Sequence, residues 1–342
     1  MQKGILLGKT LAELEQICKD LTLQRFVAKQ IAQWLYQKHV DSINDMTNIS
    51  LKSRNLLSEN FEIGRNNPLK FQESTDGTKK YLFPVLEGKF IEAAYIPEKD
   101  RATLCVSSQV GCKMACLFCM TGKQGFRGNL TAAEIINQVS SLPEREKISN
   151  IVYMGMGEPF DNTEEVMKSL EIFTSEYGFG MSPKRITVST IGIIPEMRKF
   201  LNTSKCHLAV SLHSPFDDER RILMPIQNRY PIKEVIDEIR NFNFGLQRRV
   251  SFEYIMFKGL NDKPNYIKEL ARLLNGVRCR VNLIRFHAIP GVSLVPSDLD
   301  EMENFKNALN DKGILTTIRQ SRGEDILAAC GLLSTKENSV KI

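Results

Sequence analysis

Three cysteines stand within eight residues of one another, at Cys112, Cys116 and Cys119. The spacing Cys-x3-Cys-x2-Cys supplies three thiolates, whereas complete cysteine ligation of a four-iron cluster takes four. One iron is then left open for a small molecule, just as a catalytic metal site keeps a position that a structural site fills. Phe118 directly precedes the third cysteine, where its aromatic face could meet a bound ring. The spacing therefore predicts an iron–sulfur cluster with one reactive iron.

Other interpretations fit part of this pattern. The same spacing would place three small core residues on one face of a helix. Cys116 and Cys119 alone match a redox Cys-x-x-Cys pair or half of a zinc site, but neither interpretation uses Cys112. Because Gly111 and Gly122 flank the cysteines and free cysteines are uncommon, cluster ligation is favoured.

The cluster motif, with an aromatic residue before its last cysteine, resembles that of the radical S-adenosylmethionine (SAM) superfamily. Two outlying runs are more specific. One runs from Asp100 to Cys112 and contains Cys105, and the other is Arg322-Gly-Glu-Asp-Ile-Leu-Ala-Ala-Cys330-Gly. Together these runs resemble the RlmN family of dual-specificity ribosomal and transfer RNA adenine C2-methyltransferases. The similarity covers nearly the whole chain.

The resemblance implies a [4Fe-4S] cluster, SAM and three catalytic residues. Cys330 would accept a methyl group from one SAM, and a radical formed from a second SAM would activate that methyl group for addition to adenine C2. Glu92 would then accept a proton, and Cys105 would release the RNA by forming a disulfide with Cys330. From the residues alone, each cysteine could be a buried small apolar residue, as free cysteine usually is, and an exposed strand carboxylate is the preferred interpretation of Glu92.

The resemblance also implies a set of SAM-binding residues. The Gly-Met-Gly-Glu-Pro run that ends at Pro159 would let a ligand approach the backbone, and its carboxylate would accept hydrogen bonds from an ammonium group. An ordinary strand-to-helix turn is the alternative for this run. The histidines are expected to be structural rather than acid–base groups. The implied SAM-binding residues are Gly157, Glu158, Ser189, Ser211, Leu212, His213 and, through its backbone, His287.

The chain of 342 residues has the composition of an ordinary soluble globular protein, with 42% hydrophobic and 25% charged residues. Its net charge of +6 permits a polyanionic partner without requiring one. The first apolar run is too short for a signal peptide, so a cytoplasmic protein is expected, where eight cysteines suggest metal binding or catalysis. The partners implied by the resemblance are 23S rRNA, tRNA and a flavodoxin-type electron donor, with no membrane and a monomeric chain.

The pattern of elements divides the chain into four parts. Residues 1–75 are helical in pattern, with a capping box at Thr10, and are expected to form a small accessory domain with possible RNA contact. Residues 76–100 contain two short strands joined at Leu86-Glu-Gly88, and residues 334–342 form a polar tail.

Residues 101–333 alternate between apolar strand-like runs and helical stretches, one of which begins with a capping box at Thr131. Such alternation predicts parallel β/α units, and six units fall short of the eight in a complete barrel. A partial, TIM-like (β/α)6 barrel is therefore expected, as the resemblance also implies. The six predicted strands are Thr103–Val106, Ile151–Met154, Ile186–Ser189, Leu208–Ser211, Val250–Met256 and Arg280–Phe286.

Three alternative functions remain open at this point. The nearest is a Cfr-type enzyme that methylates adenine at C8 of 23S rRNA. The others are a radical SAM enzyme acting on a protein or small molecule, and a non-enzymatic iron–sulfur carrier or RNA-binding scaffold. The basic groups Gln247–Arg249 and Arg278–Arg280, with Arg285 beyond them, could meet phosphates, although a solvated surface is the favoured interpretation.

Overall fold

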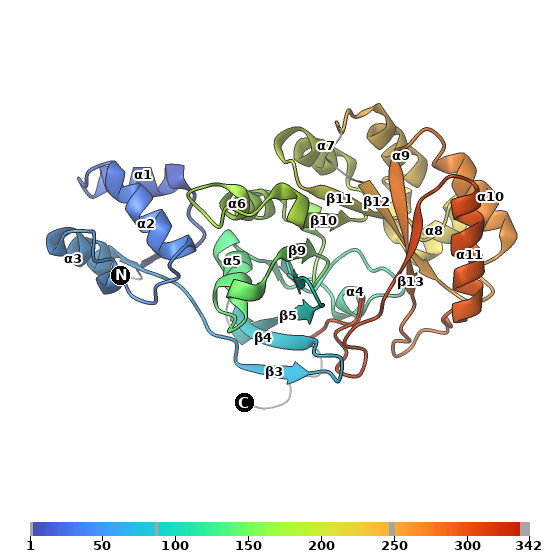
Figure 1. Cartoon of the computed structure of the whole chain (residues 1–342), viewed down its shortest axis with the longest axis horizontal. Helices are drawn as coiled ribbons and strands as arrows, with labels where there is room; N and C mark the ends of the chain where they lie inside the picture. The colour runs from blue at the N-terminus through green and yellow to red at the C-terminus, as the bar shows by residue number, and fades with distance from the viewer. Residues whose placement is uncertain (1–2, 86–87, 246–249, 336–342) are drawn as a thin grey trace.

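A curved sheet of ten strands forms the centre of the molecule (Figure 1). The computed structural model describes residues 3–85, 88–245 and 250–335. The strand order is β14-β13-β12-β11-β10-β9-β6-β5-β4-β3, and all pairs from β6 to β14 are parallel. Parallel strands place their carboxyl ends on one edge of the sheet, which is where binding sites form in such folds.

The parallel strands are short and mostly buried. They are β6 Ala102–Cys105, β9 Asn150–Tyr153, β10 Ile186–Thr190, β11 His207–Ser211, β12 Val250–Met256, β13 Cys279–Arg285 and β14 Thr316–Arg319. The first six confirm the six predicted strands, and the open, partial barrel is confirmed. The structure adds a seventh parallel strand, β14, which the sequence did not reveal because it has four residues and is polar in pattern.

Most of the helices flank the outer side of this sheet (Figure 1). They are α5 Ala132–Ser140, α6 Thr163–Thr174, α7 Ile194–Thr203, α9 Ile232–Asn241, α10 Pro264–Leu273 and α11 Leu299–Asp311, while the short α4 Met120–Gln124 and α8 Asp217–Leu223 lie near the carboxyl edge. Thr131 caps α5 with the predicted capping box. The buried faces of these helices and of the strands form one large hydrophobic core. No helix among the described residues is both long enough and apolar enough to span a lipid bilayer.

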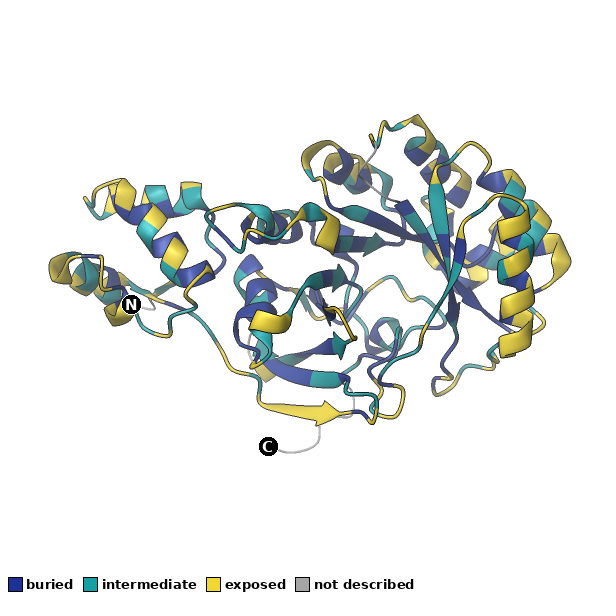
Figure 2. Ribbon diagram, viewed as in Figure 1, coloured by how far each residue is buried: buried dark blue, intermediate teal, exposed yellow. Residues whose placement is uncertain are grey.

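Three antiparallel strands extend the sheet beyond β6. They are β3 Lys70–Glu73, β4 Lys79–Val85 and β5 Lys89–Pro97, and β5 pairs with β6 so that Ala94 lies opposite Cys105. Every residue of β3 is exposed, and this edge of the sheet is open to solvent (Figure 2). Of the predicted turn between β4 and β5, residues 86 and 87 lie outside the described residues.

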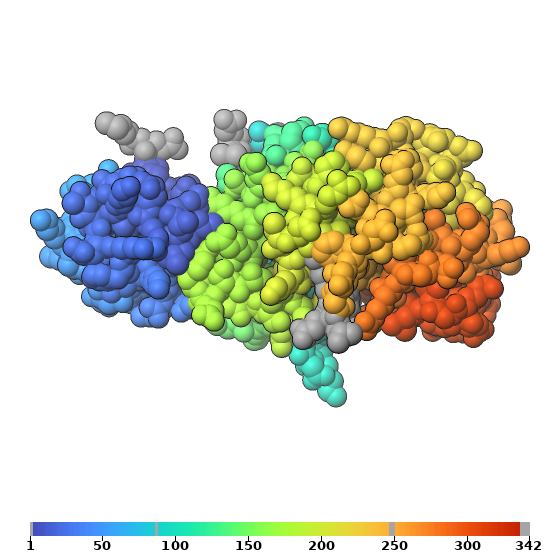
Figure 3. Space-filling model, turned by 90° about the horizontal axis from the view of Figure 1, so that it is seen from above, coloured from blue at the N-terminus to red at the C-terminus, as the bar shows by residue number. Residues whose placement is uncertain are grey.

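The N-terminal region is a small helical lobe at one end of the molecule (Figures 1 and 3). Its elements are α1 Leu11–Asp20, α2 Phe26–Tyr36, α3 Leu51–Asn60 and the parallel pair β1 Gly4–Ile5 and β2 Phe61–Glu62. Thr10 caps α1 with the predicted capping box. Because β1 and β2 pair with each other, the two ends of the lobe are held together.

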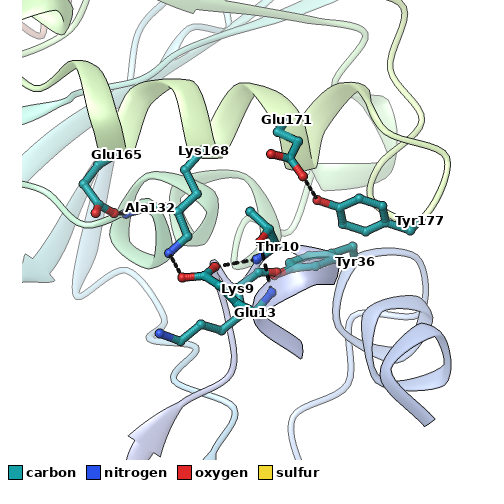
Figure 4. Close-up of polar contacts among 9 residues, drawn as sticks. All are labelled: Lys9, Thr10, Glu13, Tyr36, Ala132, Glu165, Lys168, Glu171 and Tyr177. Atoms are coloured by element: carbon teal, nitrogen blue, oxygen red, sulfur yellow. Dashed lines mark hydrogen bonds and ion pairs between the residues drawn. The ribbon is translucent and has the colours of Figure 1, made fainter. Parts of the chain in front are cut away.

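The lobe docks against α5 and α6 through a compact polar and backbone contact (Figure 4). The Lys168 ammonium lies 2.6 Å from a carboxylate oxygen of Glu13, whose other oxygen belongs to the capping box of α1. Gly8 has φ +76°, and a Cβ on it would lie 2.3 Å from the backbone nitrogen of Ala133. The chain therefore needs a residue without a side chain where the lobe meets the start of α5.

This contact predicts that Gly8→Ala destabilises the protein more than a matched glycine substitution elsewhere. Gly276 has a similar φ of +78°, but a Cβ there would meet none of the described atoms within 4 Å. Gly276→Ala should cost about 1 kcal/mol from backbone strain alone. Gly8→Ala should cost about 1–3 kcal/mol more, because rigid backbone must shift. Chemical unfolding of both variants measures the difference, and equal losses would contradict the docking contact.

Candidate active site

Two cavities open at the carboxyl edge of the parallel strands. The larger, of about 630 Å³, lies inside the curve of the sheet and reaches the amino ends of several strands. The smaller, of about 140 Å³, lies beneath the cysteine-rich loop. The two cavities share a wall of eight residues, formed by Cys119, Met154, Gly155, Glu253, Ile284, Arg319, Cys330 and Gly331. A group in that wall can act on molecules in both cavities.

The cysteine-rich loop is irregular from Gly111 to Cys119, and α4 begins only at Met120. The three cysteines therefore do not lie on one face of a helix, and the interpretation as helical core residues is wrong. Gly111 has φ +73°, and a Cβ there would lie 1.7 Å from the carbonyl oxygen of Gly125, so the loop closes tightly on itself.

All three cysteines of this loop line the smaller cavity. Among the described residues, no three His, Cys, Asp or Glu side chains converge to hold a single metal ion. A four-iron cluster makes a different demand, since each cysteine binds a separate iron. Burial raises the pKa of the Cys112 thiol to about 12, and the pKa values of Cys116 and Cys119 are also raised, first by burial. The donor set fits a cluster whose iron would replace the thiol protons.

Glu158 follows β9 and is almost completely buried. Its carboxylate accepts hydrogen bonds from Thr190 Oγ1 at 2.6 Å, Phe160 N at 3.0 Å and Ile191 N at 3.0 Å. These contacts tie the loop after β9 to the end of β10. Burial raises the pKa of Glu158 to about 7, although the three hydrogen bonds oppose this shift. An ammonium group entering the smaller cavity would favour the ionised form.

The raised pKa of Glu158 predicts a pH-dependent stability of the cluster-free protein. The folded state binds a proton on the Glu158 carboxyl more tightly than the unfolded state does. The resulting contribution to the free energy of unfolding is therefore complete below the ordinary pKa of 4.5 and is lost as pH rises through about 7. The difference between these pKa values corresponds to about 3 kcal/mol. Glu158→Gln should lack this slope, whatever its overall stability. Unfolding free energies of both proteins between pH 4.5 and 8 test the prediction, and parallel pH profiles would contradict it.

Gly157, next to Glu158, also lines the smaller cavity. Its φ is +101°, and a Cβ on it would lie 2.5 Å from Cβ of Gln109. The Gln109 amide in turn accepts a hydrogen bond from the backbone N–H of Glu158 at 2.9 Å. The glycine is thus required by packing within the protein, in addition to any approach of a ligand.

The ends of β10 and β11 are fastened by one buried side chain, Arg220 of α8. Its guanidinium donates to the carbonyl oxygens of Ile191, Ser211 and Leu212 and to Oε1 of Gln227. Burial lowers the pKa of Arg220 to about 10, so it remains charged at neutral pH. A buried charge is tolerated only when its donors are satisfied, and these carbonyls are held in place as a result. This arginine is not among the predicted site residues, because no local sequence pattern marks it.

Of the predicted SAM-binding residues on these strands, Ser189, Ser211 and His213 line the smaller cavity. Leu212 is fully buried in the core and is absent from the described lining of both cavities. His213 has φ +57° and its Nδ1 accepts a hydrogen bond from the backbone of Ile255 at 3.0 Å. Burial, with Arg220 nearby, lowers the pKa of His213 to about 3, so its imidazole is neutral.

Cys330 and Cys105 are both free and both line the larger cavity, and Cys330 lines the smaller one as well. Burial raises the pKa of the Cys105 thiol to about 12, with Cys330 as the next contribution. Arg319, at the end of β14, lines both cavities, and its pKa is raised first by attraction to Cys330. The structure therefore brings together two cysteines that are far apart in sequence, with an arginine beside them.

Glu92 is buried on β5, and it is absent from the described lining of both cavities. Its Oε1 lies 3.2 Å from the ammonium of Lys80, and its Oε2 accepts a hydrogen bond from the backbone of Ser334 at 2.9 Å. The segment that follows Cys330 thus covers Glu92. For this carboxylate to accept a proton from a bound base, that segment must move.

His287 follows β13 and lines the larger cavity rather than the smaller one. Its Nε2 lies 3.1 Å from Ser321 Oγ and its Nδ1 lies 3.2 Å from a carboxylate oxygen of Glu324. The side chain therefore contacts the segment that leads to Cys330.

Glu253 of β12 is a second residue that sequence reasoning missed. It is 3% exposed and lines both cavities. Ser251 and Asn282 donate hydrogen bonds to its Oε1 at 2.9 and 2.8 Å, while its Oε2 is buried without a partner among the described residues. A buried acceptor in a cavity wall is suited to a ligand that donates a hydrogen bond. Its position opposite Ser211 in the strand register would have been visible only with the strand pairing known.

Comparison with known proteins identifies relatives of the whole chain. The radical SAM superfamily model matches residues 106–274, and the model of the ribosomal RNA large subunit methyltransferase N-terminal domain matches residues 5–63. The chain is 58% identical to a probable dual-specificity RNA methyltransferase RlmN of Phocaeicola vulgatus, with 97% of this chain and 95% of that protein covered. It is 42% identical to the dual-specificity RNA methyltransferase RlmN of Geotalea uraniireducens, with 97% of each chain covered.

A solved structure has the same architecture. A radical SAM methyltransferase from Sphaerobacter thermophilus superimposes with a TM-score of 0.90 at 39% identity, covering 96% of this chain and 99% of that chain. The superposition therefore extends well beyond the parallel strands that the radical SAM superfamily model matches.

Proposed function

Because the chain belongs to the RlmN family of radical SAM RNA methyltransferases, we propose that it methylates C2 of adenine in 23S rRNA and tRNA. The methyl group would pass through Cys330. One observation carries this proposal: the Cys330 side chain stands in the wall between the two cavities. A sulfur atom in that position can accept a methyl group from one cavity and present it to a base in the other.

The cofactors of this family are a [4Fe-4S] cluster and SAM. Cys112, Cys116 and Cys119 would hold the cluster, and Gly157, Glu158, Ser189, Ser211, Leu212, His213 and His287 would surround SAM. For Leu212 and His287 we propose backbone contacts. When bound, the two cofactors supply the radical that activates the methyl group on sulfur.

Three residues of this chain would carry the remaining chemistry. The Cys330 sulfur is the nucleophile that accepts the methyl group. Glu92 accepts the proton that leaves adenine C2, once the segment at Ser334 has moved from it. Cys105 attacks the Cys330 sulfur, so that an S–S bond forms while the bond between that sulfur and the RNA-bound methylene carbon breaks. The carbon keeps the electron pair of the broken bond and takes up a proton, which completes the methyl group of the released RNA. An external reductant then restores both thiols.

The charge of the larger cavity supports an RNA substrate. It is lined by more basic than acidic side chains, with only Glu98 and Glu253 as carboxylates among the described lining residues. The basic residues are Arg101, Lys184, Arg185, Arg280, Arg319 and Arg322. Cations of this kind hold phosphates and position a nucleic acid without reading its sequence. Of the two basic groups in the sequence, Arg280 lies here, whereas residues 247–249 lie outside the described residues.

We further propose that the helical lobe within residues 1–75 contacts RNA, because it packs on α5 and α6 and matches the N-terminal domain of ribosomal RNA large subunit methyltransferases. The chain would act as a monomer in the cytoplasm with a flavodoxin-type electron donor, since the cluster needs an electron for each radical formed. The family assignment decides against a non-enzymatic scaffold and against a protein or small-molecule substrate.

The function is tested by reconstituting the cluster without oxygen and supplying SAM, a reductant and protein-free 23S rRNA or tRNA. We expect 2-methyladenosine in digested RNA and 5′-deoxyadenosine as coproduct. Chromatography with mass spectrometry against 2-methyl- and 8-methyladenosine standards separates C2 from C8 methylation. The Cfr-type alternative requires 8-methyladenosine, and the absence of any methylated adenosine from active, cluster-loaded enzyme would overturn the proposal.

The roles of the two outer cysteines predict separable defects. Cys330→Ala should block methyl incorporation into the protein and lower RNA methylation by at least about 1,000-fold, the scale of losing a nucleophile. Cys105→Ala should retain methyl incorporation but accumulate enzyme joined covalently to RNA. Denaturing gels with labelled RNA detect the adduct, with Cys206→Ala as the control for loss of a buried cysteine outside both cavities. A methylation-competent Cys105→Ala enzyme that never forms the adduct would refute the assignment.

A further inference from the structure

The segment that carries Cys330 has no regular secondary structure. We call residues 320–333, between β14 and Ser334, the carrier loop; no helix or strand occurs among them. Leu327 within it has φ +54°, which is unfavourable for a residue with a branched side chain. A loop of this length would sample many conformations if it were free, and ordering each residue costs about 1–2 kcal/mol. Something outside the loop must hold it in place.

The upstream half of the carrier loop is bound to the β3–β4 turn by a reciprocal pair of aspartates. Asp76 in the turn accepts a hydrogen bond from the backbone N–H of Gly323 at 3.0 Å. Asp325 in the loop accepts one from Ser74 Oγ at 2.5 Å and one from Thr75 N at 3.2 Å. Each side thus supplies one carboxylate and at least one donor.

Packing reinforces this contact. Gly323 has φ +62°, and a Cβ on it would lie 2.8 Å from Cγ2 of the fully buried Thr78. Burial alone would raise the pKa of Asp76, but its contacts with Thr78, Gly323 and Ser74 lower it to about 2, so the carboxylate is ionised at neutral pH. The guanidinium of Arg322 lies 4.0 Å from the same carboxylate. The polar Arg322–Asp325 run, which the sequence marks without explaining, therefore meets the β3–β4 turn.

The downstream half is held on α4, directly after the cluster cysteines. The Gly331 carbonyl accepts a hydrogen bond from Met120 N at 2.8 Å, and the Leu333 carbonyl accepts one from Thr121 Oγ1 at 2.7 Å. Only residues 326–330 lie between the two anchored stretches, and Cys330 is the last of them. The position of the Cys330 sulfur is therefore restricted, because the chain is anchored to α4 on one side of it and to the β3–β4 turn on the other.

We propose that the β3–β4 turn, through Ser74 and Asp76, is a positioning element for the methyl-carrying cysteine: it clamps the carrier loop so that Cys330 stays in the wall between the two cavities. This inference rests on the proposed function, since Cys330 needs such placement only if it carries the methyl group. The clamp acts through the loop and touches neither substrate nor cofactor. The clamp would raise the rate of the reaction through proximity, because a sulfur that is held near both reaction partners reacts as rapidly as in an intramolecular step.

The clamp is tested with Asp76→Asn and the double variant Asp76→Asn/Asp325→Asn in cluster-loaded enzyme. Each substitution replaces a carboxylate, which accepts hydrogen bonds from N–H or O–H groups across the contact, with an uncharged amide. Glu73→Gln is the matched control, because it makes the same chemical change on the same hairpin, and the ion-pair partner described for Glu73 is Lys79 rather than a residue of the carrier loop. Iron content and the cluster spectrum serve as checks that every variant is folded and loaded.

Two measurements are made on each protein. Hydrogen exchange of the backbone amides of residues 326–333 should accelerate by about ten-fold or more in the clamp variants. This factor corresponds to the lower end of the stabilisation that a hydrogen bond to a charged group contributes. The ratio of 5′-deoxyadenosine to methylated adenosine should rise by roughly the same factor, because a displaced sulfur leaves the radical without its partner. Glu73→Gln should match the wild-type protein in both measurements.

Unchanged exchange and an unchanged product ratio in the double variant would overturn the clamp, and so would faster exchange with a wild-type ratio. A failure of the proposed function looks different. In that case the wild-type enzyme itself would lack S-methylcysteine at position 330 and would not methylate RNA, while the exchange data would still report on the contact between loop and turn.

Discussion

The parallel arrangement of the strands from β6 to β14 is the constraint on which the site depends, because it brings all their carboxyl ends to one edge of the sheet. The cysteine-rich loop, Glu158, Ser211 and Arg319 come from widely separated parts of the chain, yet each follows or ends a strand at this edge. The sheet is open rather than closed, so its curved inner face leaves a large cavity. The proposed reaction site therefore lies at the carboxyl edge of the strands, next to a cavity that is open to an RNA substrate.

Buried polar groups give this edge its shape. Arg220 is fully buried and Glu158 almost completely so, and each must satisfy its hydrogen-bonding groups within the protein. Arg220 holds carbonyl groups at the ends of β10 and β11, and Glu158 holds the loop after β9 to β10. The smaller cavity is thus preorganised by charges that do not themselves need to react. Glu253 differs, because it lines both cavities and one of its carboxylate oxygens is buried without a partner among the described residues.

The carrier loop combines two opposing requirements. In the proposed mechanism its sulfur must stay close to both cavities, but it must also shift enough to meet a methyl donor, a base and Cys105 in turn. Anchors on both sides of residues 326–330, with no regular structure between them, satisfy both requirements. The proposed proton acceptor Glu92 accepts a hydrogen bond from Ser334, the residue that directly follows the carrier loop. In the proposed mechanism, movement of the carrier loop that also displaces Ser334 would expose Glu92.

The sequence by itself determined the features that depend on neighbouring residues. Short stretches of sequence are enough to predict the cluster spacing, the capping boxes at Thr10 and Thr131 and the six apolar strands. This is because periodicity and capping depend on residues only a few positions apart. Only the tertiary structure decided that Glu92 is covered, that Arg220 and Glu253 belong to the site, and that Ser74 meets Asp325, 251 residues away. Such contacts arise from strand order and loop placement, and no local pattern encodes which distant polar groups will satisfy one another.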